Sequence, residues 1–176
     1  MPEVVARGKL TDVIYAQLKP EEDLYLALID IARQEGIETG LVLDITGALS
    51  RVRLSLPLRT GEAGQLPGVI ELEGMFEASG HGIIGRTLDT YDGGASGIIN
   101  RQGEPYIHVH LTVTQADKTY CGHLIDGCRV RSVHPKSHFT VVLARVEGVE
   151  LNFRVSEERT PTYPKGIPYH ELRVRH

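Results

Sequence analysis

The residues from Ile107 to Leu124, IHVHLTVTQADKTYCGHL, alternate apolar and polar side chains on both sides of a short polar break. A period of two places successive side chains on opposite faces of a β-strand, whereas a helix needs an apolar stripe every three to four residues. The pattern predicts two antiparallel strands, residues 106–114 and 119–124, joined by a turn within residues 115–118. The core-facing side chains of the first strand would be Ile107, Val109, Leu111 and Val113.

The polar face of this hairpin carries three of the eight histidines in the chain. His108 and His110 are two residues apart, so they share that face. If the turn has an even number of residues, His110 lies directly opposite His123, and His108 is its diagonal neighbour at about 7–8 Å. An odd number would place His123 on the other face. The turn has no Asn-Gly or similar signal, so the sequence leaves both alternatives open.

Three imidazoles placed together can hold one metal ion at nitrogen–metal distances of about 2.0–2.1 Å and leave a further position open. The hairpin therefore predicts a metal site made of His108, His110 and His123. Zinc is the first candidate because neutral imidazole suits it, and iron, manganese, nickel and copper are alternatives. The competing interpretation is a solvated polar face that happens to carry histidines.

One helix is predicted, over residues 20–35, in KPEEDLYLALIDIARQEG. Pro20 and the three acidic residues after it suit a first helical turn, where the helix dipole is positive. Leu24, Leu28 and Ile31 form one apolar stripe, and Gly36 supplies the stop.

Most of the remaining chain has the period of strands. Strands are predicted at residues 41–45 and 50–56, in GVIELEGMFEASG, and once or twice in HFTVVLARVEGVELNFRV. Several short strands and one helix indicate an α+β fold, a mostly antiparallel β-sheet with one main helix packed on it. A chain of 176 residues fits a single domain, residues 1–176.

Two segments depart from the strand pattern. Residues 80–103 contain seven glycines and are predicted to form a long surface loop. Residues 157–176 are rich in proline and are predicted to form an extended tail that packs on the domain or on a neighbour.

The composition is that of an ordinary soluble globular protein, with 41% hydrophobic and 24% charged residues. A formal charge of -4 argues against a chain-wide attraction to nucleic acid. The two cysteines are too few for a disulfide framework, the N-terminal residues show no signal peptide, and no apolar run approaches the length of a transmembrane helix. We therefore expect a cytoplasmic protein without a membrane partner.

The chain resembles the plants-and-prokaryotes-conserved (PPC) domain, a family of largely unknown function. The resemblance extends over residues 18–143 and rests on LKPEEDLYLALIDIARQEGIETGLVLDITGALSRVRL, EGMFEASG, GEPYIHVHLTV and GHLIDG. A turn at Thr46-Gly47-Ala48 belongs to the same pattern. The glycine-rich segment 80–103 looks like an insertion relative to the usual PPC connection.

The resemblance implies a sheet-and-helix α+β fold and a homotrimer. It also implies that His108, His110 and His123 correspond to the metal-binding histidines of the family, whose fold looks like that of acetolactate decarboxylase. Plant relatives add AT-hook segments, and bacterial relatives often carry a DNA-binding label. This chain has no Arg-Gly-Arg-Pro segment, which is the part of an AT-hook that binds the minor groove of DNA.

The first functional hypothesis is a metal-dependent enzyme, such as a lyase or hydrolase, that acts on a small oxygen-rich molecule. The candidate acid or base is Glu77, which matches a glutamate of the EGxxE stretch of the family. Arg101 and Glu104, just before the hairpin, could bind an anionic substrate. His81 could be a further ligand or substrate contact. Cys121 stands where a glycine is common in the family.

Two alternatives remain. A DNA-binding or regulatory module would use the basic side chains Arg51, Arg53, Arg129, Arg131 and Lys136. A trimeric scaffold would use the metal only to stabilise the assembly.

His134 and His138 are predicted to lie at the surface.

Overall fold

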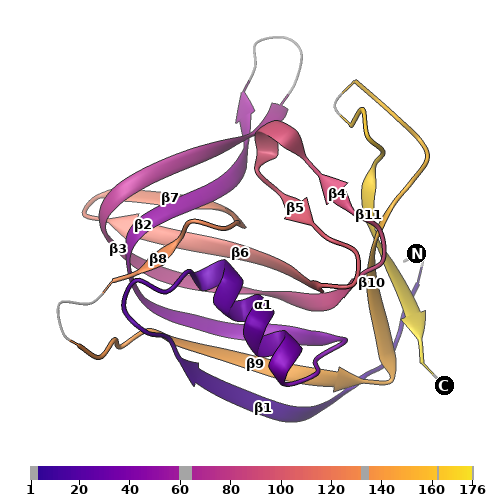
Figure 1. The fold of residues 1–176 in the computed structure, drawn as a ribbon, viewed down its shortest axis with the longest axis horizontal. Coiled ribbons are helices and arrows are strands. Elements are labelled where there is room, and N and C mark those ends of the chain that lie inside the picture. Colours follow the sequence, from indigo (N-terminus) through magenta and orange to yellow (C-terminus); the bar gives the residue numbers. More distant parts are fainter. Residues whose placement is uncertain (1–3, 60–64, 132–134, 162, 176) are drawn as a thin grey trace.

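The computed structural model describes residues 4–59, 65–131, 135–161 and 163–175. It confirms the α+β expectation, because one α-helix packs on a mainly antiparallel sheet in these ranges (Figure 1). The elements in chain order are β1 Lys9–Gln17, α1 Leu24–Gln34, β2 Gly40–Arg59, β3 Gln65–Thr87, β4 Tyr91–Asp92, the 3-10 turn η2 Gly94–Ser96, β5 Ile99–Asn100, β6 Pro105–Gln115, β7 Lys118–Leu124, β8 Arg129–Val130, β9 Thr140–Glu147, β10 Val149–Val155 and β11 Pro168–Val174.

The large sheet has the strand order β1-β9-β2-β7-β6-β3-β10-β11, and β2 also pairs with β3. The four strands β2, β7, β6 and β3 therefore close into a ring of hydrogen-bonded neighbours. Only the pairing of β10 with β3 is parallel among the described pairs. Helix α1 packs beside β6 (Figure 1), and its buried apolar residues join the core side chains of the ring in one cluster.

Helix α1 begins four residues later than the sequence predicts. The side chain of Asp23 caps it by accepting hydrogen bonds from the backbone N–H groups of Tyr25 and Leu26. The predicted start at Pro20 is wrong because the residues just before Leu24 pair with β8 instead of forming a helical turn. Glu21 has a φ of 65° and its N–H donates to the carbonyl of Val130.

Strand β2 runs without a break through the segment where two strands and a turn were predicted. It bends at two register shifts, and Gly47 keeps the pairing to β3 with a φ of 149°. A Cβ at this position would lie 2.6 Å from the ring of Phe139. The predicted turn at residues 46–48 is therefore wrong: the glycine makes room for a core aromatic ring inside a strand.

The hairpin of β6 and β7 has the register that the metal-site hypothesis requires. Its loop contains two residues, Ala116 and Asp117, so the even alternative is correct. His110 is the direct cross-strand partner of His123. The apolar face is buried as predicted, with exposed fractions of at most 4% for Ile107, Val109, Leu111 and Val113.

The glycine-rich segment 80–103 is a surface loop only in part. Residues 80–87 continue β3 and pair with β6, and the following residues form a small arm of β4, η2 and β5 (Figure 1). Glycine is needed at Gly82 for a close approach, since a Cβ there would lie 2.2 Å from the carbonyl oxygen of His108. The alternation in this segment was hidden by glycines, which carry no side chain to read.

The proline-rich end packs on the domain, one of the two predicted outcomes. Strand β11 pairs with β10 along its length, and Phe153 is the cross-strand partner of His170. This pairing places His170, a residue near the end of the chain, in the large sheet. Across the described ranges, no helix has the length and apolar character needed to cross a lipid bilayer.

Candidate metal centre

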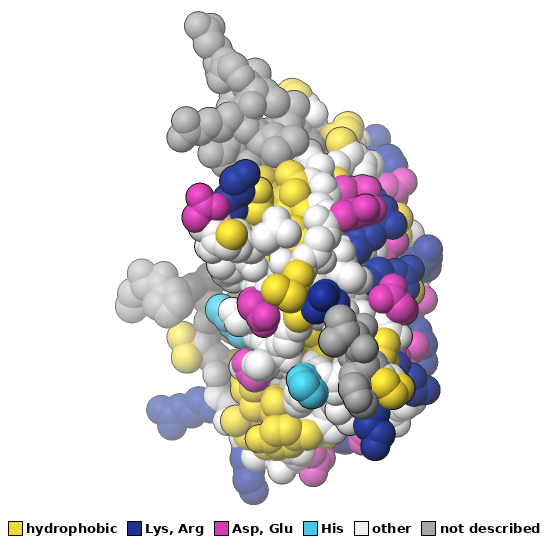
Figure 2. All heavy atoms as spheres, turned by 90° about the vertical axis from the view of Figure 1, so that its left-hand side faces the viewer, with side chains coloured by type: hydrophobic (Ala, Val, Ile, Leu, Met, Phe, Trp, Pro, Cys, Tyr) yellow, Lys and Arg dark blue, Asp and Glu magenta, His cyan; other side chains and the backbone are white. Residues whose placement is uncertain are grey.

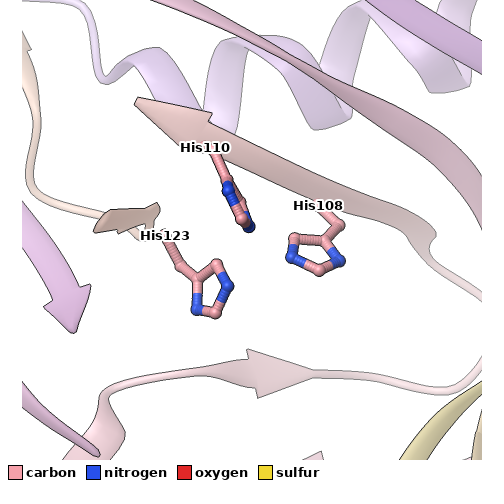
Figure 3. Close-up of side chains that lie close together, drawn as sticks. All are labelled: His108, His110 and His123. Carbon is pink, nitrogen blue, oxygen red and sulfur yellow. The ribbon is translucent and has the colours of Figure 1, made fainter. Parts of the chain in front are cut away.

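Three histidines meet on the polar face of the β6–β7 hairpin. One possible ligand atom from each of His108, His110 and His123 lies within 4.8 Å of the other two. The ring centroid of His123 is 4.8 Å from the ring centroids of His108 and of His110. The ring centroids of His108 and His110 are 5.3 Å apart. Figure 3 shows the three rings gathered around a common space, with two side chains projecting from β6 and one from β7.

The donor set suits a transition-metal ion. A tetrahedral zinc ion with nitrogen ligands at about 2.0–2.1 Å holds these nitrogens about 3.3 Å apart. The three rings can reach that spacing by side-chain rotation, because the hairpin already places them on one face. Three neutral imidazoles leave a coordination position open, which is the arrangement of catalytic rather than closed structural zinc sites.

His108 makes further polar contacts with two residues outside the three-histidine group. Its Nδ1 is 3.1 Å from the hydroxyl of Tyr106 and 3.3 Å from Nε2 of His170. The same hydroxyl is 2.9 Å from Nε2 of His170. If Nε2 of His108 is the metal ligand, Nδ1–H donates to the Tyr106 oxygen and the Tyr106 hydroxyl donates to His170. Such partners fix the ring orientation of a metal ligand.

Burial keeps two of the rings neutral. Desolvation, together with the charges of the neighbouring His123, His170 and His110, lowers the pKa of His108 to about 4. The pKa of His123 is lowered by desolvation and by His110, and that of His170 by desolvation. A neutral imidazole is the form that binds a metal, so the site favours the ligand state at neutral pH.

Sequence reasoning missed His170 and Tyr106. His170 lies 62 positions after His108 and reaches it only because β11 pairs with β10, which in turn pairs with the end of β3. The segment PYHELRV alternates only weakly, and the three prolines within residues 157–176 indicated an extended tail. Tyr106 was assigned to the first strand without a role, although it stands two residues before His108 on the same face.

The structure does not bring Glu77 to the histidines. Glu77 is exposed and pairs with Thr114, whereas His110 pairs with His81, four positions along the same strands. Four strand residues span about 13 Å. Within one chain, Glu77 is therefore too far away to exchange a proton directly with a metal-bound group, and its catalytic role stays a prediction.

His81 lies closer to the hairpin histidines than its position in the sequence suggests. It is the direct partner of His110 on β3, so both side chains are on the same face of the sheet, and His81 is exposed. Cys121 pairs with Thr112 on that face and is also exposed. Neither belongs to the group within metal-binding reach, which among the described residues comprises the three hairpin histidines.

A cavity of about 920 Å³ adjoins the histidines. His108 and His123 line it together with Arg101 and Glu104, so the two predicted substrate contacts share a cavity with two of the proposed ligands, and their role stays a prediction. Their side chains form a long ion pair of 3.9 Å. Arg33 of α1 is also 3.9 Å from Glu104.

Most of the basic residues proposed for nucleic acid are paired with acids. Arg51 and Arg53 both contact Glu71, at 3.1 and 3.0 Å. Arg129 is 3.9 Å from the buried Asp23. On the face drawn in Figure 2, Lys and Arg side chains are interspersed with Asp and Glu side chains rather than gathered in one basic patch.

The two histidines in VHPKSHF differ in what the structure describes. His138 is exposed, as predicted. His134 lies outside the described residues.

Solved structures with the same fold are found in several organisms. A metal-containing protein from Archaeoglobus fulgidus has 15% sequence identity, a TM-score of 0.65, and coverage of 88% of this chain and 93% of its own. A PPC protein from Pyrococcus horikoshii has 18% identity, a TM-score of 0.65, and coverage of 97% and 99%. A Bacteroides thetaiotaomicron protein described as a candidate DNA-binding protein has 15% identity, a TM-score of 0.60, and coverage of 93% and 96%.

No curated protein matches the chain. The sequence profile of the Plants and Prokaryotes Conserved (PCC, also written PPC) domain matches residues 5–135, which include α1, the β2–β3 pair and all three hairpin histidines. A match over most of the chain, together with the shared fold, confirms the resemblance: the chain belongs to the Plants and Prokaryotes Conserved domain family.

Proposed function

We propose that His108, His110 and His123 bind one divalent transition-metal ion, zinc before the alternatives, and that the bound metal serves chemistry on a small molecule. The observation that carries this proposal is the approach of three imidazole ligand atoms to within 4.8 Å of one another on one hairpin face. The metal-containing relative from Archaeoglobus fulgidus supports it.

The metal, when bound, would polarise a carbonyl group or lower the pKa of a bound water to about 7. Around that centre, residues of the chain orient one of the metal ligands and line the cavity. Tyr106 and His170 hold the ring of His108, and Arg101 and Glu104 line the same cavity as two of the ligands. This arrangement supports a lyase or hydrolase that acts on a small oxygen-containing substrate.

The proton-transfer group of such an enzyme needs a position near the metal. The Tyr106 hydroxyl is within hydrogen-bond distance of both His108 and His170, and because burial raises its pKa it stays protonated and donates to His170. Glu77 remains the candidate named from the family pattern. Glu77→Gln should retain the metal and lose turnover only if Glu77 takes part.

We also propose that the protein is a homotrimer, as the family resemblance implies. Strand β1 supports self-association because it lies at the edge of the large sheet. Its side chains Leu10, Val13 and Tyr15 have exposed fractions of 49%, 54% and 74%. An exposed apolar edge strand is a surface that another chain can cover.

DNA binding is the second candidate function, and the name of the Bacteroides thetaiotaomicron protein favours it. The ion pairs of Arg51, Arg53 and Arg129 leave these side chains less able to neutralise phosphates. Contacts to phosphate weaken steeply with salt. DNA retention that falls by orders of magnitude between about 50 and 200 mM salt would favour this function, and absence of retention at low salt would exclude it.

A trimeric scaffold with a structural metal is the third candidate. Removing the metal would then dissociate or unfold the trimer.

Elemental analysis of protein purified without a histidine tag and without added metal tests the proposal. We expect one transition-metal ion per chain. Absence of metal, together with failure to take up zinc on titration, would contradict it. Chelation followed by sedimentation then separates an enzyme from a scaffold, because a catalytic metal can leave without dissociating the assembly.

A further inference from the structure

The cavity beside the histidines is lined by several parts of the fold. Most of the lining comes from α1, from residues 96–101, from the first half of β6 and from β11, and β2, β4, β7 and β10 contribute further residues. Two of the proposed metal ligands, His108 and His123, belong to this lining. A volume of about 920 Å³ is at the upper end of the range for small-molecule sites, about 300–1,000 Å³. The space therefore exceeds what a ligand of two or three carbon atoms would fill.

The aromatic side chains of the protein are concentrated around this cavity. Five of the seven tyrosines line it, together with one of the three phenylalanines. These residues are Tyr25, Tyr91, Tyr106, Tyr163, Tyr169 and Phe153. Aromatic walls favour contact with a flat apolar group. Leu26 and Ile99 also line the cavity and keep exposed fractions of 47% and 46%, so apolar surface remains uncovered there.

One polar group in the lining has no partner. Asn100 has an exposed fraction of 4%, and its side-chain Nδ2 makes no hydrogen bond with any described residue. A buried donor without a partner is costly, so such a group indicates a missing acceptor. Nδ2 is itself covered, but Asn100 lines the cavity, so rotation of its side chain would bring Nδ2 to an acceptor of a ligand there.

The charges around the cavity argue against a polyanionic ligand. Both of its arginines are paired, Arg33 with Asp30 at 2.7 Å and Arg101 with Glu104 at 3.9 Å. Asp126 adds a third carboxylate to the lining. Three carboxylates therefore face two arginines in the lining, which disfavours a phosphate chain because it needs cationic partners.

We propose that this cavity binds an amphipathic small molecule with an apolar, ring-bearing body. One oxygen-bearing end lies at the histidines and a separate acceptor oxygen receives the hydrogen bond of Asn100. The apolar body packs between α1 and residues 96–101. This inference rests on the proposed metal site for the oxygen-bearing end, and it narrows the substrate from an oxygen-rich molecule to a mostly apolar one.

Calorimetric titration of the zinc-loaded full chain with two hydroxamic acids tests the apolar body. Benzohydroxamic acid and acetohydroxamic acid carry the same metal-binding group, and only the first has a ring. We expect benzohydroxamic acid to bind at least about tenfold more tightly, because a buried ring adds apolar contact. Leu26→Asp should remove this preference. The matched control Met75→Asp changes an exposed apolar residue outside the lining and should keep it.

The role of Asn100 is tested with 3-acetyl and 4-acetyl derivatives of benzohydroxamic acid, which add an acceptor oxygen at two positions on the ring. We expect at least one of them to bind about two- to tenfold more tightly than the parent. Asn100→Leu should remove that gain, because the donor Nδ2 is lost, while Asn100→Asp, which keeps the shape of the side chain but has no N–H donor, should remove it as well. Asn100→Ala provides the same test if the leucine variant does not fold.

The outcomes separate this inference from the metal site. If zinc binds and the two simple hydroxamic acids bind equally, the apolar cavity proposal is wrong and the metal site stands. If zinc binds but no acetyl derivative gains affinity, the assignment of Asn100 is wrong. If zinc does not bind, the proposed function fails first, and the inference fails with it.

Discussion

The sequence predicts which three residues are the proposed metal ligands, but it does not predict that Tyr106 and His170 contact one of them. The period of a strand places His108 and His110 on one face, and the even turn of the hairpin adds His123 to them. The contacts of Tyr106 and His170 to His108 could not be predicted, since they depend on the pairing of β11 with β10. Nothing local in the tail indicates which strand it joins.

The contact of His170 gives a prediction for metal affinity. His170→Ala removes one partner of His108 but leaves all three ligands in place. We expect zinc affinity to fall about 10–100-fold, as is typical when a group that orients a metal ligand is removed. Competition titration with a chelator measures this. His138→Ala, which changes an exposed histidine elsewhere, should leave the affinity unchanged, and equal affinities in both variants would contradict the role of His170.

The lowered pKa of His108 gives a prediction for the metal-free protein. The pKa is about 4 in the folded state and about 6.5 in the unfolded state, so between these values the unfolded chain binds more protons. The free energy of unfolding should therefore rise with pH across this window, and the contribution of His108 should be lost as pH falls toward 4.

Urea denaturation at several pH values, for the wild type and for His108→Ala, isolates this contribution because other titrating groups cancel in the comparison. The wild type should show the steeper rise between pH 4 and 6.5. Identical slopes would contradict the prediction.

The alternation predicted the hairpin but left its register open between an even and an odd turn, and it did not predict the continuous strand β2. The period of two is explicit in residues 107–114, where each core-facing position is apolar. In β2 the pattern is interrupted at Gly47, whose backbone conformation and close contact with Phe139 are tertiary features. The helix start moved for a related reason, because pairing of Glu21 with β8 replaced the first helical turn.

The position of Gly47 gives a prediction for stability. Gly47→Val adds a side chain at a φ of 149° and against the ring of Phe139. We expect a loss of about 2–4 kcal/mol in the free energy of unfolding, from backbone strain and overpacking together. Denaturant titration measures it. The neighbouring Ala48→Val, in the same strand and without positive φ, should change stability by less than about 1 kcal/mol, and equal losses in both variants would show that Gly47 has no special role.

For the complete chain, the order of predicted strands and helix was enough to predict the fold class. The association of chains depends on exposed surfaces, which the periodicity of the sequence does not reveal. The ring of β2, β7, β6 and β3 places the histidines on its polar face, and the additional strands β1 and β11 lie at the two ends of the sheet. One end supplies His170 to the site. The other presents the apolar side chains of β1 to solvent.

The proposed trimer gives a prediction for mass in solution. Sedimentation equilibrium at micromolar concentration should report three times the chain mass of 19.4 kDa. Tyr15→Glu places a charge on the exposed edge strand and should shift the protein toward a monomer. Met75→Glu, at an exposed site on β3, is the control and should not. A wild-type monomer at this concentration would contradict the trimer.

The most direct test of the metal centre is the metal content of the histidine variants. His108→Ala, His110→Ala and His123→Ala each leave two ligands, and we expect zinc affinity to fall by orders of magnitude in all three. Circular dichroism should remain that of the wild type, because the apolar face of the hairpin is unchanged. His138→Ala should keep one ion per chain. Full metal occupancy in His110→Ala and in His123→Ala would contradict the metal centre and leave these histidines as a solvated face of the sheet.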